Sequence, residues 1–156
     1  MAVVTRGRPS APGASGSAVT GLRVLAMCLG VFLIAQGVGK LTWFTDSGPL
    51  NGALQGWLKD ATPTSRWYLE TFAIPGVPIF ARLVALGELL GGTALLVGLW
   101  PRLAAAAAFL MVLNFHVASG AIFQTRFLTN GYGLPVLGGL LALAIGGSRL
   151  PWTVRE

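Results

Sequence analysis

The stretch from Arg82 to Arg102, RLVALGELLGGTALLVGLWPR, constrains the fold of this chain more than any other. Between its two arginines lie 19 residues, and Glu88 is the only ionisable one among them. A helix of about 20 apolar residues is long enough to cross the ~30 Å hydrocarbon core of a bilayer. A carboxylate inside such a span is costly to bury, so Glu88 indicates either a functional site or an ion pair that fixes helix packing.

The composition of the chain is that of a membrane protein. Of its 156 residues, 54% are hydrophobic and only 10% are charged, whereas soluble domains carry about 25% charged residues. The net charge of +6 does not indicate nucleic-acid binding, because the basic residues are scattered between apolar runs and do not alternate with stacking aromatic residues. The length allows one membrane domain without a separate soluble one.

Four apolar runs predict membrane-spanning helices at about residues 21–44, 79–99, 103–123 and 131–147. We therefore expect an all-α protein, an integral membrane four-helix bundle over residues 21–148. Residues 1–20 are expected to be a flexible cytoplasmic tail, and residues 149–156 a second cytoplasmic tail. A secretory signal peptide is the alternative at the N-terminus. The first apolar run is long, however, and no convincing small-residue cleavage site follows it, so we expect a retained helix.

The only long connection, residues 45–78, lies between the first two predicted helices, on the extracytoplasmic side. Polar and aromatic residues interleave at roughly helical spacing in LNGALQGWL and SRWYLETF. This pattern predicts two short amphipathic segments on the membrane surface, with an ordinary structured loop as the alternative. Pro75 and Pro78 end the connection and favour the start of the next helix.

The distribution of lysine and arginine predicts the orientation. With the N-terminus inside, the cytoplasmic segments contain Arg6, Arg8, Arg23, Arg102, Arg149 and Arg155. The outer side contains Lys59, Arg66 and Arg126, with Lys40 and Arg82 near the outer helix ends. The count is nearly even, but the long acid-containing connection is readily translocated, and the short turn at Arg102 keeps its charge inside. We therefore expect both termini in the cytoplasm.

This topology brings polar residues of three helices to one depth in the outer half of the bundle. Measured from the predicted outer helix ends, Glu88 lies ~13 Å deep, His116 ~10 Å and Gln36 ~12 Å. Lys40 and Arg82 lie about one turn above them. Glu88 and His116 are the candidate catalytic residues of this polar layer, and the cations and Gln36 are candidate ligand-binding residues.

Spacing limits which of these side chains can meet. Arg82 is six residues from Glu88, about 120° away around the helix, so the two are not stacked. Either the long side chain of Arg82 or Lys40 of the first helix has to form the ion pair. Asn114, also a candidate for the layer, is two residues from His116 and faces nearly the opposite way. Both cannot line one pocket, and we favour His116.

Metal and cysteine chemistry have few candidate residues in this chain. One histidine without a neighbouring cysteine or second carboxylate makes a weak metal site, so no metal is expected, and haem ligation by two histidines of one chain is impossible. Cys28 is the only cysteine, which excludes an intrachain disulfide and a CxxC redox pair. P-loop, dinucleotide and hydrolase-triad motifs are also absent from the sequence.

Several segments resemble the DoxX-like family of membrane proteins. They are FARLVALGELLGGTALLVGLWPRLAA, the GVGK of residues 37–40 and LNFHVASG. The stretches TFAIPGVPIFARL and RFLTNGYGLPVLGGLLALAIGG are more similar to the DoxD branch, which includes the small membrane subunit of thiosulfate:quinone oxidoreductase. The likeness covers about residues 22–148, and its most specific part is the pattern Arg82, Glu88, Gly98 and Arg102.

The resemblance implies a four-helix membrane protein, often part of a redox complex that passes electrons to quinone. The sequence has no recognisable thiosulfate-handling centre, so we expect partner subunits to supply part of the site. The first hypothesis is a quinone-linked oxidoreductase subunit in a bacterial cytoplasmic membrane, with the polar layer binding quinone and exchanging protons. The second is a non-catalytic structural or assembly subunit of a larger membrane complex. A small transporter is third, because no pair of broken helices marks a substrate site.

Overall fold

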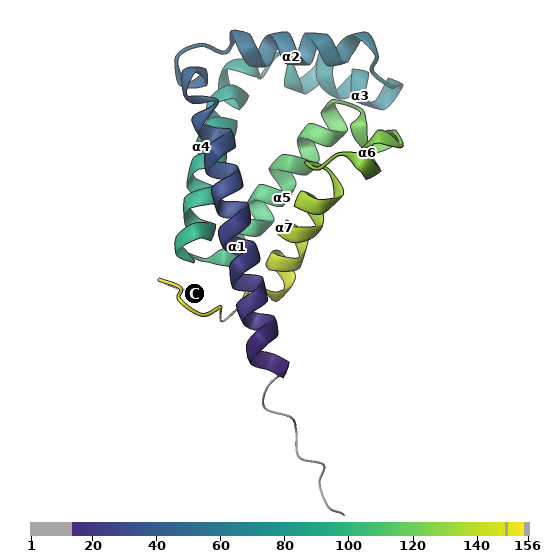
Figure 1. Cartoon of the computed structure of the whole chain (residues 1–156). Coiled ribbons are helices and arrows are strands. Elements are labelled where there is room, and N and C mark those ends of the chain that lie inside the picture. Colours follow the sequence, from purple (N-terminus) through teal and green to yellow (C-terminus); the bar gives the residue numbers. More distant parts are fainter. Residues whose placement is uncertain (1–13, 149, 155–156) are drawn as a thin grey trace, which may run out of the picture.

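The structure, a computed structural model, describes residues 14–148 and 150–154, and these residues form helices without any strand (Figure 1). The three longest helices are α1 (Ala14–Val38), α4 (Val77–Val97) and α5 (Pro101–Ala118). A shorter apolar helix, α7 (Leu134–Gly146), packs against α5 and α1. The all-α class predicted from the apolar runs therefore agrees with the described part of the chain.

Three helices are long and apolar enough to cross a membrane, namely Gly16–Val38 within α1 and the whole of α4 and α5. The 13 residues of α7 extend only about 20 Å at 1.5 Å per residue, which is less than the ~30 Å of a hydrocarbon core. The protein is thus a multi-pass membrane protein, and within the described residues three of its four predicted spans have the required length.

Helix ends follow the prolines and glycines. α4 carries Pro78 in its first turn, where a missing N–H costs nothing. It ends at Gly98, whose φ of 76° lies in the left-handed region that glycine adopts without a steric penalty. α5 likewise ends shortly before Gly120, which has a φ of 69°. Both glycines stop their helices by turning the chain.

α1 and α5 end earlier than predicted. α1 stops at Val38 instead of residue 44, and α5 stops at Ala118 instead of residue 123. In each case a short 3₁₀ turn follows, at Leu41–Phe44 and Ala121–Phe123. Apolar periodicity does not distinguish such a turn from one more turn of α-helix, so the predicted depths of Gln36 and His116 were measured from ends that are not α-helical.

The predicted N-terminal tail differs in part from the structure. α1 begins at Ala14, so residues 14–20 of the predicted tail are helical. The rest of that tail, residues 1–13, lies outside the described residues, and so do Arg149 and residues 155–156 of the predicted C-terminal tail.

The long connection between α1 and α4 lies across one end of the molecule, which we call the cap end (Figure 1). Its helices are α2 (Gly48–Lys59), α3 (Pro63–Tyr68) and a π-helical turn at Leu69–Ala73. Leu50 and Leu54, one turn apart in α2, are buried against the bundle, whereas Lys59 is exposed. Both amphipathic segments predicted here are helical.

The opposite end, where α1 begins and residues 150–154 lie, is the terminal end, and in its half of the bundle α1 and α4 are tightly packed against each other. A Cβ added at Gly30 of α1 would lie 2.7 Å from the carbonyl oxygen of Gly92 in α4, and one added at Gly92 would lie 2.8 Å from that of Gly30. Only residues without a side chain allow two helix backbones to approach so closely. Leu95 and Leu140 are fully buried in the adjoining core.

Two arginines close helix C-termini at the terminal end. Arg23 of α1 is 3% exposed and donates to the carbonyl oxygens of Leu95 at 2.8 Å and Leu96 at 2.7 Å. Arg102 donates from Nε to the carbonyl oxygen of Ala144 in α7 at 3.0 Å. The last turn of a helix has unpaired carbonyls and a partial negative charge, which both arginines satisfy. From the sequence, both were expected only to set the orientation.

Candidate functional site

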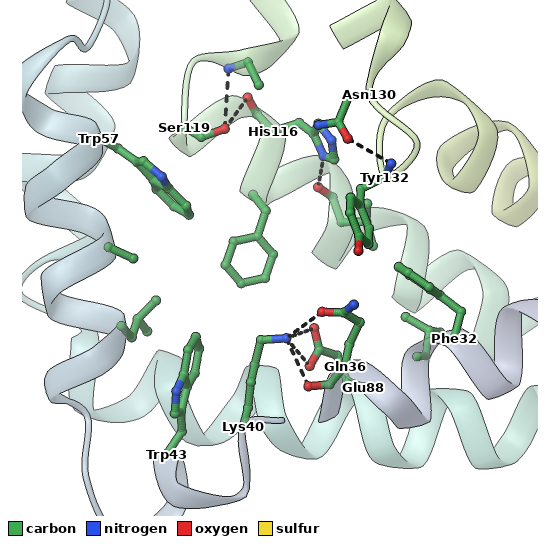
Figure 2. A pocket seen from close by; sticks show the side chains of 16 residues that line it. Phe32, Gln36, Lys40, Trp43, Trp57, Glu88, His116, Ser119, Asn130 and Tyr132 are labelled. Carbon is green, nitrogen blue, oxygen red and sulfur yellow. Dashed lines mark hydrogen bonds and ion pairs between the residues drawn. The ribbon is translucent and has the colours of Figure 1, made fainter. Parts of the chain in front are cut away.

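A cavity of about 330 Å³ lies in the cap half of the bundle (Figure 2). It forms where α1 and α4 diverge from α5 and α7 toward the cap end (Figure 1), and α2 covers it with Leu50, Ala53 and Trp57. Most of its wall is apolar, and aromatic rings are prominent. The aromatic residues that line it are Phe32, Trp43, Trp57, Phe115 and Tyr132.

An ion pair between Lys40 and Glu88 forms one polar side of the cavity. Lys40 Nζ lies 2.8 Å from each carboxylate oxygen of Glu88 and also contacts the Gln36 carbonyl oxygen at 3.2 Å and its Oε1 at 3.5 Å. Lys40 follows the last turn of α1, which places its side chain beside Gln36 one turn earlier. The two alternatives for the cation are thereby reduced to one, since Arg82 takes no part.

The ion pair is largely shielded from solvent. The side chain of Lys40 is 17% exposed and that of Glu88 is 8% exposed. Two opposite charges at this separation, with further hydrogen bonds to Gln36, offset much of the cost of removing each from water. Gln36 points its amide oxygen at Lys40, so its amide nitrogen remains available as a donor on the cavity side.

His116, in the last turn of α5, provides the other polar side. Its Nδ1 lies 2.8 Å from the carbonyl oxygen of Val112. A carbonyl only accepts, so Nδ1 carries the proton, and in the neutral ring Nε2 is an acceptor. Among the described residues Nε2 has no hydrogen-bond partner. Phe127 packs edge-on against the ring, with centroids 5.3 Å apart, and holds its orientation.

Figure 2 shows these two polar groups on opposite sides of the cavity, with Lys40, Glu88 and Gln36 on one side and His116 on the other. Ser119 and Asn130 lie near His116 in the same view. The arrangement offers a donor and a charge pair at one edge of an aromatic slot and a free imidazole nitrogen at the other. It suits a flat, mostly apolar ligand with polar atoms at two opposite edges.

Two predicted site residues lie outside this cavity. Arg82 is exposed and donates to the carbonyl oxygen of Pro78, within its own helix. Asn114 accepts a hydrogen bond from the Tyr68 hydroxyl at 2.6 Å and so joins α5 to the cap. Asn114 and His116 line different pockets, as their spacing requires.

Several cavity residues were not predicted as site residues. Trp57 and Ala53 belong to the amphipathic pattern of the connection, which indicates a buried face but not what that face covers. Phe32 is one apolar residue among many in α1. Tyr132 and Asn130 reach the cavity through the irregular connection between α5 and α7, and no sequence pattern indicates that path.

Metal-ligating side chains do not gather in the described part of the chain. Groups of three or more His, Cys, Asp or Glu side chains near one another are absent from it. Cys28 is exposed on α1, and it is not among the residues that line the cavity.

Comparison with protein families identifies the fold. The family model for DoxX matches residues 21–120. The chain belongs to the DoxX family. The matched range contains all four polar residues of the cavity that were predicted from the sequence, whereas Asn130, Tyr132 and α7 lie beyond it. No curated protein and no solved structure matches this DoxX protein.

Family membership agrees with the structure that this is a membrane protein, and it adds an association with redox functions. The apolar helices and the family match both describe a protein of the lipid bilayer. DoxX proteins are often associated with oxidoreductase-related functions. A cavity with groups that can hold and transfer protons is compatible with that association.

Proposed function

We propose that this DoxX protein is the integral membrane subunit of a quinone-linked oxidoreductase complex, and that its cavity binds the quinone head group. The observation that carries the proposal is the placement of polar groups on two opposite sides of an aromatic cavity within the bilayer. Lys40, Glu88 and Gln36 form one side, and His116 Nε2 forms the other.

The residues present fit such a head group. A quinone head group is a flat ring with one oxygen at each of two opposite edges. The cavity volume of about 330 Å³ lies within the ~300–1,000 Å³ of small-molecule sites. Trp43 and Trp57 provide flat apolar surfaces for the ring. Lys40 and the Gln36 amide are donors for one oxygen, and His116 is a donor for the other when Nε2 carries a proton.

The chain's own residues supply proton handling. A bound quinone accepts two electrons and two protons and leaves as the quinol. His116 takes up a proton at Nε2 from solution and donates it to one oxygen as the quinone is reduced. At the other oxygen the Lys40–Glu88 pair donates the second proton and regains it from solution. The electrons come from a donor held by a partner subunit, and the oxidised substrate in the DoxD-like members that this chain resembles is thiosulfate.

The proposal includes a bacterial cytoplasmic membrane with both termini in the cytoplasm. Arg23 and Arg102 both lie at the terminal end, and positive residues favour the cytoplasmic side. The cap end, and with it the cavity, then faces the outer half of the bilayer.

Direct binding tests the site. Purified protein in lipid nanodiscs is titrated with a short-tailed ubiquinone analogue by calorimetry. We expect His116→Ala to raise Kd at least tenfold, because a polar partner of the head group is lost. Asn114→Ala is the matched control, on the same helix but outside the cavity, and it leaves Kd within twofold. Equal Kd values in both variants would contradict the site.

Turnover tests the redox role. Thiosulfate-dependent quinone reduction is measured in membranes with wild type and Glu88→Gln at matched expression. A large fall in rate with Glu88→Gln is expected, because the amide cannot hold a proton for the quinone. If Glu88→Gln and His116→Ala both leave quinone reduction intact, the proposal is wrong.

A second function has its own supporting observation. Gly91 of α4 and Gly138 of α7 face open space, with no atom within 4 Å of an added Cβ, so a helix of another subunit can approach there. If the protein is a non-catalytic subunit that packs within a larger complex, Gly138→Leu should leave it folded but separate it from that complex on native gels. Migration of wild type as a lone monomer in mild detergent argues against this function.

A further inference from the structure

Because α7 is short, it does not form the wall of the cavity beside the cap half of α1. α7 meets α1 only in the terminal half, where Leu25 and Leu29 of α1 lie against Gly139 and Leu22 lies against Gly146. Above the start of α7, the wall between α1 and α5 consists of the connection 119–133. This part of the wall is therefore made of short turns, the 3₁₀ turn Ala121–Phe123 and the four-residue helix α6 (Arg126–Thr129), and of the chain around them.

Two aromatic rings fill the boundary between that connection and α1. Phe32 and Tyr132 have ring centroids 5.5 Å apart and an interplanar angle of 39°. Both line the cavity, and Figure 2 shows them together at one side of it. Tyr132 is 56% exposed, whereas Phe32 is partly buried. The pair thus separates the cavity from the surroundings of the bundle.

The surroundings at this point are hydrocarbon. Phe32 lies within the membrane-spanning part of α1, six residues before its end at Val38, or ~9 Å below that end. On the side toward water, α2 covers the cavity with Leu50 and Trp57. A ligand that passes between Phe32 and Tyr132 therefore comes from the lipid.

Several backbone amides of the connection are hydrogen-bonded within the connection itself. Its amides are bonded within short turns: Phe127 to Gln124, Leu128 to Thr125, and Gly133 to Asn130, at 2.9 to 3.0 Å. The Tyr132 amide donates to the Asn130 side chain at 3.0 Å. Backbone groups at membrane depth have no water to bond, so internal pairing of this kind lowers the cost of a connection at the edge of the bundle.

We infer that the cavity opens sideways to the bilayer between Phe32 and Tyr132, and that its ligand is a quinone with a long isoprenoid tail. This inference rests on the proposed function. The head group enters from the lipid, and the tail stays in the opening and in the hydrocarbon beyond it. Each methylene transferred from hydrocarbon to water costs about 0.8 kcal/mol, so a long tail excludes an approach from the water side.

The opening needs little movement. The Tyr132 ring packs on Phe32, and its hydroxyl makes no hydrogen bond to the described residues. Exposed side chains change rotamer within nanoseconds, so the ring can swing aside while the backbone of α1 and of the connection stays in place.

The test joins positions 32 and 132 by a cross-link, in a Cys28→Ser background that removes the native thiol. Phe32→Cys and Tyr132→Cys are joined by a short cleavable bismaleimide, and binding is measured in nanodiscs for a long-tailed ubiquinone and for a tail-less benzoquinone. Relative to the same double-cysteine protein before cross-linking, we expect the cross-link to weaken binding of the long-tailed quinone at least tenfold, to leave that of the tail-less one within threefold, and to be reversed by cleavage. The control cross-link, between Leu22→Cys and Gly146→Cys below the cavity, changes neither.

Other outcomes overturn the inference in distinguishable ways. If the cross-linked protein binds both quinones as before, the lateral route is wrong while the head-group site stands. If the uncross-linked protein binds neither quinone, the proposed function fails and the inference with it. Independently, Tyr132→Ala is expected to raise the association rate of the long-tailed quinone at least threefold, and an unchanged rate would contradict the opening.

Discussion

The terminal half and the cap half of this protein contain parts of the same helices but use polar residues in opposite ways. In the terminal half, Arg23 donates to backbone carbonyls of α4, and the glycine contact between Gly30 and Gly92 leaves no space between helices. In the cap half, Lys40 and Glu88 bond to each other beside a cavity. In the terminal half a charged side chain caps a helix end, whereas in the cap half the charged side chains border a cavity where a ligand can reach them.

This difference indicates how a small membrane protein combines stability with a binding site. The Arg23 side chain is held by two backbone carbonyls and is 3% exposed, so its guanidinium is out of reach of a ligand from outside. A side-chain pair can exchange partners, since both members move. Substitutions confined to one half should therefore show how far stability and ligand binding depend on different residues.

The largest effect is expected at the ion pair. Lys40→Met leaves the Glu88 carboxylate buried without a cation, and we expect a loss of about 3–5 kcal/mol of unfolding free energy. The double variant Lys40→Met with Glu88→Leu recovers most of that loss, because no buried charge remains. Unfolding in detergent, followed by circular dichroism, measures both.

The exposed pair Arg66–Glu70 is the control for this prediction. Its side chains are 46% and 54% exposed with a separation of 3.4 Å, so Arg66→Met is expected to cost less than about 1 kcal/mol. A double variant at Lys40 and Glu88 no more stable than Lys40→Met alone would show that the loss does not come from an unpaired charge.

The next effect is expected at Arg23. Arg23→Met removes two charged hydrogen bonds and leaves the carbonyls of Leu95 and Leu96 without their partner, and we expect a total loss of about 3 kcal/mol, at ~1.5 kcal/mol for each bond. Hydrogen exchange should rise in the last turn of α4 and not in its first turn. Arg102→Met, which removes one bond from an exposed side chain, serves as the milder comparison. Uniform exchange along α4 would contradict the capping role.

Two glycine substitutions should change the free energy of unfolding in opposite directions. Gly30→Ala forces apart two backbones and is expected to cost about 1–3 kcal/mol. Gly91→Ala, on the open side of α4, is expected to be neutral or to stabilise by up to about 1 kcal/mol, because alanine is the better helix former. Thermal unfolding in one detergent compares them directly. Equal losses at both positions would remove the claim of a close contact specific to Gly30.

The smallest effect is expected where the cap is attached. Tyr68→Phe removes the hydrogen bond to Asn114 at a cost of about 1 kcal/mol, and hydrogen exchange should increase in α3. Asn114→Ala should have the same effect, and the double variant should add little to either. Additive losses would mean that the two side chains act separately.

The sequence predicted the long helices better than it predicted their ends. Apolar runs placed the starts of α4 and α5 within two residues, at 79 against Val77 and at 103 against Pro101. The ends of α1 and α5 were wrong by five or six residues, because a 3₁₀ turn shares the periodicity of a helix over so short a length. The shortness of α7 was missed for a similar reason, since residues 131–133 are apolar or small but not helical.

The candidate site was predictable where it depends on helix geometry. Angular spacing along α4 showed that Arg82 and Glu88 are not stacked and left Arg82 or Lys40 as the cation, and the same argument separated Asn114 from His116. The aromatic wall was not predictable, because Trp57 and Tyr132 reach the cavity through connections whose paths depend on tertiary packing. The functional roles of the polar residues remain predictions.

Arg23 also has a consequence for the biosynthesis of this protein. The chain emerges from the N-terminus, so α1 meets the insertion machinery before α4 exists, and at that moment Arg23 acts only as a positive charge that favours the cytoplasmic side. Once α4 has been inserted, the same guanidinium becomes the cap of its last turn. With both termini in the cytoplasm, as proposed, the same side chain would first favour that direction of insertion and then hold the last turn of α4. Replacing it by a neutral residue should therefore impair insertion and assembly together.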